Sequence, residues 1–203
     1  MPEAPTPQRL NDHPSQRFNA PTPMNEALTY ANDHFDRFTE ELEDLLRIPS
    51  VSTDSSYAGD VKDAAHWLSK NLSEVGVEHV EVVETGGHPI VYAEHHVSDD
   101  KPTVLVYGHY DVQPPDPLEL WETPPFEPKR KNGTLYARGA CDDKGQMFMH
   151  VKATEAYLQQ EGELPVNLKF LIEGEEETGS VHLAPFIEEN QEKLAADVVL
   201  ISD

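Results

Sequence analysis

Three apolar runs in this chain end in the same way. The run "PVNLKFLIE" leads directly into "GEEETG", the run "TVLVYGHYD" ends on His109 and Asp111, and the run "ADVVLISD" ends on Asp203. Continuous apolar runs of this length are typical of strands that are buried on both faces of a parallel sheet. Because ligands in such sheets bind outside the carboxyl ends of the strands, the pattern predicts an acid-rich site at that edge.

Helices are expected before and between these strands. Apolar spacing predicts one helix from Met24 onward, ended where Pro49 disfavours helix at Ile48, and further helices over residues 60–75, 144–160 and 181–194. Other strands are expected in "HVEVVE", "IVYAEHHV" and "TLYARGA". The alternation predicts an α/β fold whose largely parallel sheet is covered on both faces. The positions expected to be buried in the first two helices are Leu28, Phe35, Phe38, Leu42, Leu45, Leu46, Ala64, Trp67, Leu68 and Leu72.

The charge balance is strongly acidic. The 203 residues include 38 Asp and Glu against 15 Lys and Arg, which gives a formal net charge of -23. Such a surface repels nucleic acid, so nucleic acid is excluded as a partner. The excess has two interpretations: a solvated face, or acids of which a few hold cations. The total does not separate these two interpretations, but the positions of the acids can.

Other classes are excluded by what the sequence omits. A single cysteine allows neither an intrachain disulfide nor a multi-cysteine zinc site. The start of the chain lacks the pattern of a secretory signal, and no apolar run reaches the ~18 residues of a membrane span. We therefore expect a cytoplasmic protein with no membrane partner. Residues 1–23, rich in Pro, Asn and Gln, are expected to be a disordered leader.

His109 and Asp111 lie two residues apart on an extended segment, so their side chains point to the same side. This arrangement suits a neutral imidazole that binds a metal while a nearby carboxylate orients the ring. The alternative is a histidine satisfied at a strand end, which is the better interpretation of a lone histidine. The acids at equivalent strand ends favour the metal site.

Asp142 and Asp143, in "RGACDDKGQ", come just before a predicted helix. One interpretation is helix capping, since an acid at the first turn stabilises free N–H groups and the helix dipole. One acid is enough for a cap, which leaves the other free for a metal. Cys141 beside them is expected to be a small packing residue.

The run "EGEEETG" places three carboxylates in a row. Neighbouring carboxylates repel each other unless cations or protons intervene. Two divalent ions about 3.5–4 Å apart would need a bridging carboxylate, further acid and histidine ligands, and an acid that takes a proton from water. One acid of this run can be a ligand and its neighbour the base. The alternative is a solvated loop.

These segments also carry a family resemblance. "YGHYDVQP", "NGTLYARGACDDKG", "LIEGEEETGS" and "VVLISD", together with "PPFEP", resemble the ordered motifs of the dinuclear-zinc metallopeptidases. That family contains carnosine-type dipeptidases, glutamate carboxypeptidases, aminoacylases, acetylornithine deacetylases and succinyl-diaminopimelate desuccinylases. The resemblance runs from Ala27 to Asp203, and "GHYDVQP" and "DDKG" resemble the dipeptidase branch more than the deacetylase branch. It implies a three-layer αβα sandwich with a mixed, mostly parallel central sheet.

The resemblance also implies a metal-ligand set. His109 and Asp203 match the ligands of one zinc, and Asp142 matches the ligand that bridges both ions, with a cis peptide bond just after it. Glu177 matches a ligand of the other zinc. The implied cofactors are two divalent ions, zinc first, with manganese or cobalt as alternatives.

Two further acids match catalytic positions of the family. Glu176 matches the general base, and Asp111 matches the acid that orients the site and tunes that base. The implied reaction is hydrolysis of the amide bond of dipeptides or short peptides. The alternatives are an N-acyl amino-acid deacylase of the same family and a non-catalytic metal-binding fragment. The expected partner is accordingly a small peptide or an N-acyl amino acid.

The resemblance covers only part of a typical family member. Residues 24–203 resemble the N-terminal part of the catalytic domain, without the lid that carries the dimer interface and without the C-terminal half. The histidine that completes the zinc site of Glu177 belongs to that second half. The full-length form is expected to be a homodimer, and whether this chain is active alone is left open.

Overall fold

The centre of the fold is a mixed five-stranded sheet. The structure is a computed structural model that describes residues 23–203, so the expected leader at 1–23 lies outside the described residues except for its last position. The strand order is β1-β2-β6-β3-β7, with β3 parallel to both β6 and β7 and β2 antiparallel to both of its neighbours. Four of the five strands therefore run in one direction. The strands are β1 (His79–Val83), β2 (Ile90–His95), β3 (Thr103–His109), β6 (Asn167–Glu173) and β7 (Val198–Ile201).

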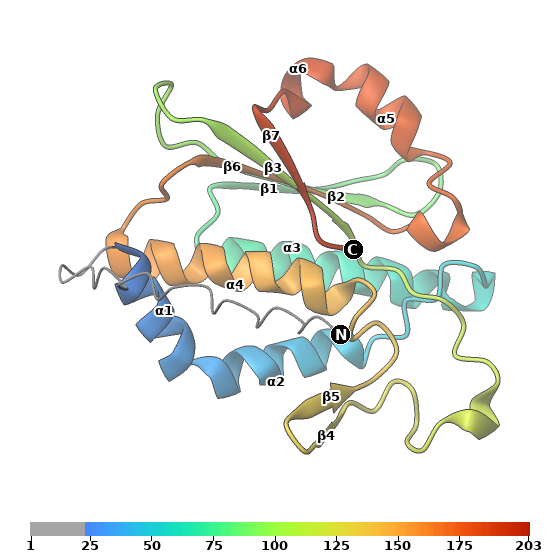
Figure 1. Ribbon diagram of the computed structural model, residues 1–203. Coiled ribbons are helices and arrows are strands. Elements are labelled where there is room, and N and C mark those ends of the chain that lie inside the picture. The colour runs from blue at the N-terminus through green and yellow to red at the C-terminus, as the bar shows by residue number, and fades with distance from the viewer. Residues whose placement is uncertain (1–22) are drawn as a thin grey trace, which may run out of the picture.

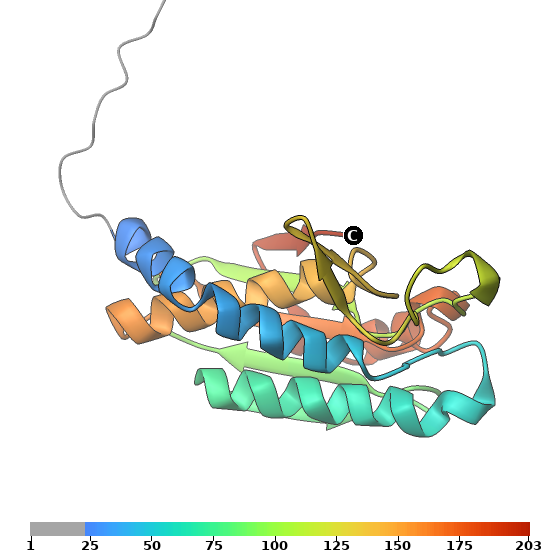
Figure 2. The ribbon, with the colours of Figure 1, turned by 90° about the horizontal axis from the view of Figure 1, so that it is seen from below.

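Helices cover both faces of this sheet, as Figure 1 shows, and the predicted three-layer α/β fold is confirmed. One face carries α3 (Ala58–Val75) and α4 (Lys144–Glu161), and the other carries α5 (Leu183–Glu189) and α6 (Gln191–Leu194). Outside the first pair lie α1 (Pro23–Asp33) and α2 (Phe35–Leu46), with α2 between α3 and α4 in Figure 2. Within residues 23–203, no helix is both long and apolar enough to cross a membrane. Three short 3₁₀ turns are η1 (Ser55–Tyr57), η2 (Leu118–Leu120) and η3 (Glu176–Thr178).

Two predicted helices are each broken by a polar residue. The single helix expected from Met24 onward is α1 followed by α2, and the helix expected over residues 181–194 is α5 followed by α6. At the breaks, His34 Nδ1 lies 2.8 Å from Tyr30 O, and Asn190 Nδ2 donates to Phe186 O at 2.8 Å. Side chains that bond to nearby carbonyls can compete with the helix backbone; at His34 the backbone N–H also donates to Tyr30 O, at 3.0 Å, so the ring shares that carbonyl.

The first break also changes which side chains are buried. Leu28 and Phe35, expected on the buried face, are 55% and 64% exposed. Leu45 and Leu46 are buried as predicted, and in α3 only Trp67 of the predicted set is partly rather than fully buried. The prediction of one continuous apolar face across both helices was therefore wrong, because the chain changes direction at His34.

A small hairpin stands apart from the main sheet. The strand predicted in "TLYARGA" is only β5 (Thr134–Tyr136), and it pairs with β4 (Lys129–Lys131), which the sequence did not predict. Asn132 and Gly133 join them with φ angles of 54° and 78°. Positive φ at both turn residues is the geometry that favours an Asn-Gly pair in a tight hairpin.

Each face of the sheet has its own apolar core. On the α3 and α4 side, the core includes Val106 of β3 and Phe170 of β6. On the α5 and α6 side, it includes Leu105 and Leu171, the neighbours of those residues in sequence. This alternation is what a strand buried on both faces requires. The edge strand β7 differs, since all four of its side chains are exposed.

Candidate metal centre

Three parallel strands end at the same edge of the sheet. In the register, His109 at the end of β3 pairs with Glu173 at the end of β6, and Tyr107 pairs with Ile201 at the end of β7. The chain then runs from β7 to Asp203, which lies near the start of α4 in Figures 1 and 2. Asp142 precedes that helix. Parallel pairing thus brings together residues that are far apart in the sequence.

His109, Asp142 and Asp203 form a group that could hold a metal ion. Their ligand atoms all lie within 4.8 Å of one another. His109 Nε2 is 3.0 Å from Asp142 Oδ1 and 3.8 Å from Asp203 Oδ1, and it is buried with no hydrogen-bond partner among the described residues. A buried polar atom without a partner is costly, and one nitrogen with two carboxylates is a donor set that suits a divalent cation. The residues present therefore fit a metal ion.

The imidazole of His109 is held from its other side. Its Nδ1 is 3.0 Å from the backbone oxygen of Asp111 and 3.4 Å from Asp111 Oδ1. Burial alone lowers the pKa of His109, but Asp111, together with Asp143 and Asp142, outweighs burial and raises the pKa to about 9. A proton and a cation therefore compete for Nε2, so cation binding should release a proton.

Asp111 is fully buried, and its carboxylate holds the backbone of the acidic loop. Its carboxylate accepts hydrogen bonds from the backbone N–H of Glu176 at 3.2 Å and of Glu177 at 3.1 Å. Ser52 Oγ donates to the same carboxylate at 2.6 Å. The geometry thus connects Asp111 to both the ring of His109 and the loop that carries the predicted base.

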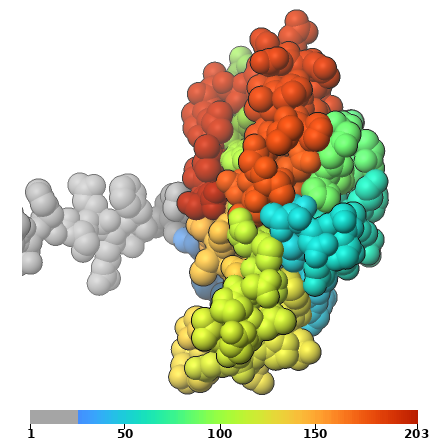
Figure 3. Space-filling model, turned by 90° about the vertical axis from the view of Figure 1, so that its right-hand side faces the viewer, coloured from blue at the N-terminus to red at the C-terminus, as the bar shows by residue number. Residues whose placement is uncertain are grey.

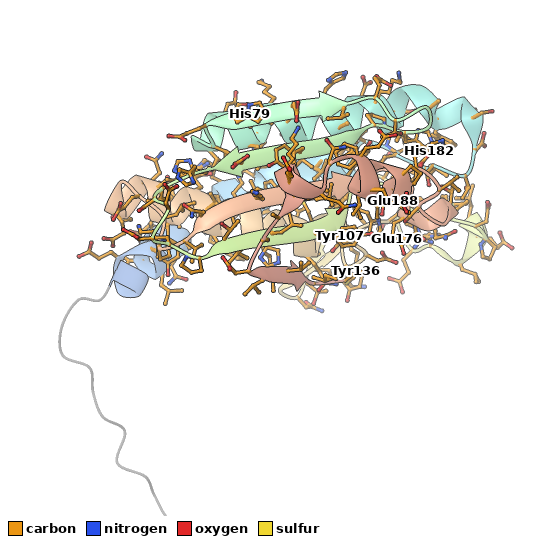
Figure 4. The ribbon with its side chains drawn as sticks, turned by 90° about the horizontal axis from the view of Figure 1, so that it is seen from above. His79, Tyr107, Tyr136, Glu176, His182 and Glu188 are labelled. Carbon is orange, nitrogen blue, oxygen red and sulfur yellow. The ribbon has the colours of Figure 1, made fainter. Side chains whose placement is uncertain are left out.

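The first acid of the "EEE" run is a structural clamp. Glu175 accepts from His88 N at 3.0 Å, and its other oxygen lies 2.8 Å from His182 Nδ1. A Cβ on Gly87 would lie 1.8 Å from Glu175 Oε1, so only glycine fits there. The buried carboxylate of Glu175 thus joins the β1–β2 loop to the start of α5, where Figure 4 labels His182. For Glu175, the solvated-loop interpretation was wrong.

The other two acids, Glu176 and Glu177, are half-buried beside Glu175. Glu177 Oε2 accepts from Gln113 Nε2 at 2.6 Å, and burial, followed by the charges of Asp142 and Asp111, raises the pKa of Glu177. Glu176 is labelled in Figure 4 beside Tyr107, whose pKa is raised first of all by burial, then by Glu173, with a smaller contribution from Glu176. Neither glutamate joins the close group of His109, Asp142 and Asp203. The structure therefore brings together three of the four predicted ligands, and Glu177 stands apart from them.

The two aspartates of "DDKG" have different environments. The peptide bond between Asp142 and Asp143 is cis, as the resemblance implied. Asp143 occupies the position before α4 but makes no side-chain capping bond; its Oδ2 accepts from His109 N at 3.0 Å instead. Burial raises the pKa of Asp143 to about 6. The capping interpretation was wrong for Asp143, which supports the strand that carries His109, and Cys141 is exposed rather than packed.

Other residues around the centre were not predicted. Glu173, at the end of β6, is buried and accepts from Tyr107 at 2.6 Å and Ser180 at 2.8 Å. Lys144 is fully buried and donates to Leu45 O at 3.1 Å and Ile48 O at 2.7 Å, and burial lowers its pKa to about 7. Apart from Ser180, their partners lie 66 to 99 residues away, so local patterns carried little signal for them.

Comparisons with known proteins point to one family. Residues 105–203 match the family described as "Peptidase family M20/M25/M40". The Cys-Gly metallodipeptidase DUG1 of Saccharomyces cerevisiae is 34% identical over 183 residues, which cover 82% of this chain and 38% of that protein. The Beta-Ala-His dipeptidase of Homo sapiens is 32% identical over 205 residues, covering 92% and 40%.

Solved structures agree with these sequence matches. The crystal structure of human carnosine dipeptidase 1 superposes with a TM-score of 0.85 at 32% identity, covering 90% of this chain and 41% of that one. The structure of Dug1p from Saccharomyces cerevisiae gives a TM-score of 0.82 at 31% identity, covering 89% and 41%. The chain thus spans about 40% of the length of these relatives.

Proposed function

Because this chain belongs to peptidase family M20/M25/M40, we propose that its protein hydrolyses the amide bond of dipeptides or other short peptides by metal-dependent attack of water. The observation that carries the proposal is the buried His109 Nε2, which faces the carboxylates of Asp142 and Asp203 and has no other hydrogen-bond partner among the described residues. This nitrogen lies at the carboxyl ends of parallel strands, which is where sheets of this class bind their ligands.

The proposed metal ligands follow from the geometry and from the family resemblance. His109, Asp142 and Asp203 would hold one divalent ion. The family resemblance adds Glu177, which together with Asp142 would contribute to a second ion. Zinc suits imidazole and carboxylate donors, and manganese and cobalt are alternatives. When bound, such ions lower the pKa of water and polarise the scissile carbonyl.

The chain's own acids would handle the proton. We assign Glu176 as the base that takes a proton from the attacking water and passes it to the leaving amine. Asp111 would keep Glu176 in place, since it accepts a hydrogen bond from the Glu176 backbone N–H. Gln113 would orient Glu177 through the 2.6 Å hydrogen bond between their side chains.

The proposed substrate class is a dipeptide with a free amino terminus. Relatives are named for Cys-Gly and for Beta-Ala-His, which are both dipeptides of this kind. Carboxylates gathered at the edge of the sheet favour a substrate that brings a positive charge. The homodimer and the cytoplasmic location stay predictions.

A second candidate is removal of an acyl group from an amino acid. The Succinyl-diaminopimelate desuccinylase of Bordetella avium is 32% identical over 155 residues, covering 74% of this chain and 39% of that protein. Both reactions break an amide bond, so the same metal centre suits either one. Only the substrate separates them.

The test is a substrate panel on metal-free protein reloaded with zinc or manganese. Cys-Gly and β-Ala-His represent dipeptides, and N-succinyl and N-acetyl amino acids represent the alternative. Glu176→Gln should keep the metal and lose turnover by about 100-fold or more. The matched control is Glu188→Gln, an exposed acid on α5 that Figure 4 labels and that should leave turnover unchanged.

Metal content, measured by elemental analysis, separates the possible outcomes. Turnover that survives both a chelator and Glu176→Gln would contradict the proposal. Stoichiometric metal without turnover on any substrate would favour the non-catalytic metal-binding alternative. Turnover confined to N-acyl amino acids would favour the deacylase.

A further inference from the structure

A cavity of about 520 Å³ lies away from the metal centre, between the loop that follows β3 and the β4–β5 hairpin. Its lining includes Pro117, Leu120, Trp121 and Tyr136, and none of the candidate metal-centre residues. Figure 3 shows this loop, in yellow-green, at the end of the molecule opposite α5 and α6. The volume falls within the ~300–1,000 Å³ typical of small-molecule sites. We call it the hairpin pocket.

The two faces of β4 have different roles. Lys129 pairs in register with Tyr136, and both line the pocket together with Lys131. Arg130, between the two lysines, faces the opposite way, where its Nε is 2.5 Å from Glu43 Oε1 on α2. Strand alternation thus lets one side chain anchor the hairpin while its neighbours line the cavity.

One wall of the hairpin pocket is a fixed aromatic ring. Trp121 Nε1 donates to Pro115 O at 2.7 Å, and the guanidinium of Arg138 lies 5.5 Å from the indole ring centre. Beside this wall, Leu120 is 76% exposed and Tyr136 is 51% exposed. Large apolar side chains left open around a concave site favour an apolar ligand.

The charged side chains that line the hairpin pocket are Lys129, Lys131 and Glu122, so lysines outnumber acids here in a chain that is otherwise strongly acidic. Lys131 Nζ is 3.2 Å from Glu122 Oε2, so this lysine already has a carboxylate partner. Lys129 makes no ion pair with any residue in the described part of the chain. An ammonium group beside an apolar cavity is complementary to a carboxylate attached to an apolar group.

We propose that the hairpin pocket binds a small apolar carboxylate, with the carboxylate on Lys129 and the apolar body against Trp121 and Leu120. The ligand chemistry has two sources: a free aromatic or aliphatic acid, or the carboxyl end of a peptide whose last side chain is apolar. Because no metal-centre residue lines the pocket, this site is independent of the proposed hydrolysis.

Trp121 provides a direct readout. The chain has two tryptophans, Trp67 on α3 and Trp121 in the pocket, so a nitrogen–proton NMR spectrum contains two indole signals. A Trp121→Phe variant assigns them. The probes are 3-phenylpropionate and its amide, and Gly-Gly-Phe with a free or an amidated carboxyl end, all titrated in the presence of a chelator.

We expect 3-phenylpropionate to shift the Trp121 signal and leave Trp67 unchanged, with the amide about five-fold weaker or more. Lys129→Gln should weaken binding of the acid by about five-fold, while Lys70→Gln, an exposed lysine on α3, should have no effect. A shift with the free acid alone identifies a small-molecule site, and a tighter shift with the peptide acid identifies a peptide end. No shift of Trp121, or equal binding of acid and amide in the wild type, would overturn the proposal.

Discussion

The molecule holds acidic side chains in two contrasting ways. In the helix ion cluster, formed by Arg37, Glu41, Lys152 and Glu155, every carboxylate is paired with a cation from the chain itself. Arg37 is 2.6 Å from Glu41 and also pairs with Glu155, and Lys152 is 2.9 Å from Glu155 and also pairs with Glu41. Burial alone raises the pKa values of Glu41 and Glu155, but these hydrogen bonds outweigh it and lower both.

In the metal centre the acids face one imidazole. Among the described residues, Asp142 and Asp203 form ion pairs with His109 alone, and the pKa values of Asp143 and Glu177 are raised, first of all by burial. One cluster therefore completes its charge balance within the fold, and the other leaves room for a cation from solution. Position, rather than the net charge of the chain, separates these two uses of acidic residues.

The largest expected effect tests the helix ion cluster. Lys152→Met removes a buried cation between two carboxylates, and unpairing buried charges costs about 3–5 kcal/mol in free energy of unfolding. Chemical denaturation followed by circular dichroism measures it. Lys70→Met, which breaks an exposed pair on α3, is the control and should cost about 0.5 kcal/mol or less. Equal losses in the two variants would mean that burial does not distinguish the cluster.

Added zinc should stabilise the protein through the metal centre and not through the helix ion cluster. Zinc at 100 times its dissociation constant should stabilise the protein by about 2.7 kcal/mol, measured as a rise in melting temperature. Asp142→Asn should abolish this increment because it removes one of the two carboxylates that face His109. Glu155→Gln should keep it. An equal zinc increment in both variants would place the cation elsewhere.

Replacing a carboxylate by its amide should cost more stability in the helix ion cluster than in the metal centre when no metal is added. Glu155→Gln leaves two buried or half-buried cations with a weaker partner, so we expect a loss of about 1–2 kcal/mol. Asp142→Asn removes repulsion among the acids, but it also removes a carboxylate that faces the protonated His109, so the two contributions offset each other and we expect a change of about 0.5 kcal/mol or less. Denaturation in the presence of a chelator measures both. Two losses of equal size would contradict the contrast.

The smallest expected effect is the acid dependence of the helix ion cluster. Because the folded-state pKa values of Glu41 and Glu155 lie below their unfolded values, their stabilisation is present above the unfolded pKa and is lost as pH falls through the folded pKa. The unfolding free energy should decline below about pH 4.3. Glu155→Gln should make that decline shallower, and an unchanged decline would assign it to other carboxylates.

The sequence predicts the strands of the site better than their surroundings. The apolar runs of β3, β6 and β7 identify buried strands, and their parallel pairing brings His109 and Asp203 together as expected. At the helix breaks, His34 and Asn190 place side chains against nearby carbonyls, a local feature that apolar periodicity does not register. Apolar patterns in the sequence thus predict which segments are buried better than they predict where a helix is interrupted.

The roles of individual acids were harder to predict for a different reason. Asp143 finds its partner in the backbone of His109, 34 residues away, and Glu175 finds one in His88, 87 residues away. Within each run the neighbouring acids are chemically alike, so only the folded register distinguishes a clamp from a free carboxylate. Local sequence carries no such information.

The strand order has a consequence for how the molecule assembles. Strand β3 lies between β6 and β7, both of which follow it in the chain by dozens of residues. Such non-local pairings form slowly. During synthesis of the chain, β3 is complete before its partner strands β6 and β7 have been made. His109, Asp142 and Asp203 therefore come together only after β7 has paired with β3, so an ion held by all three reports that this pairing has formed.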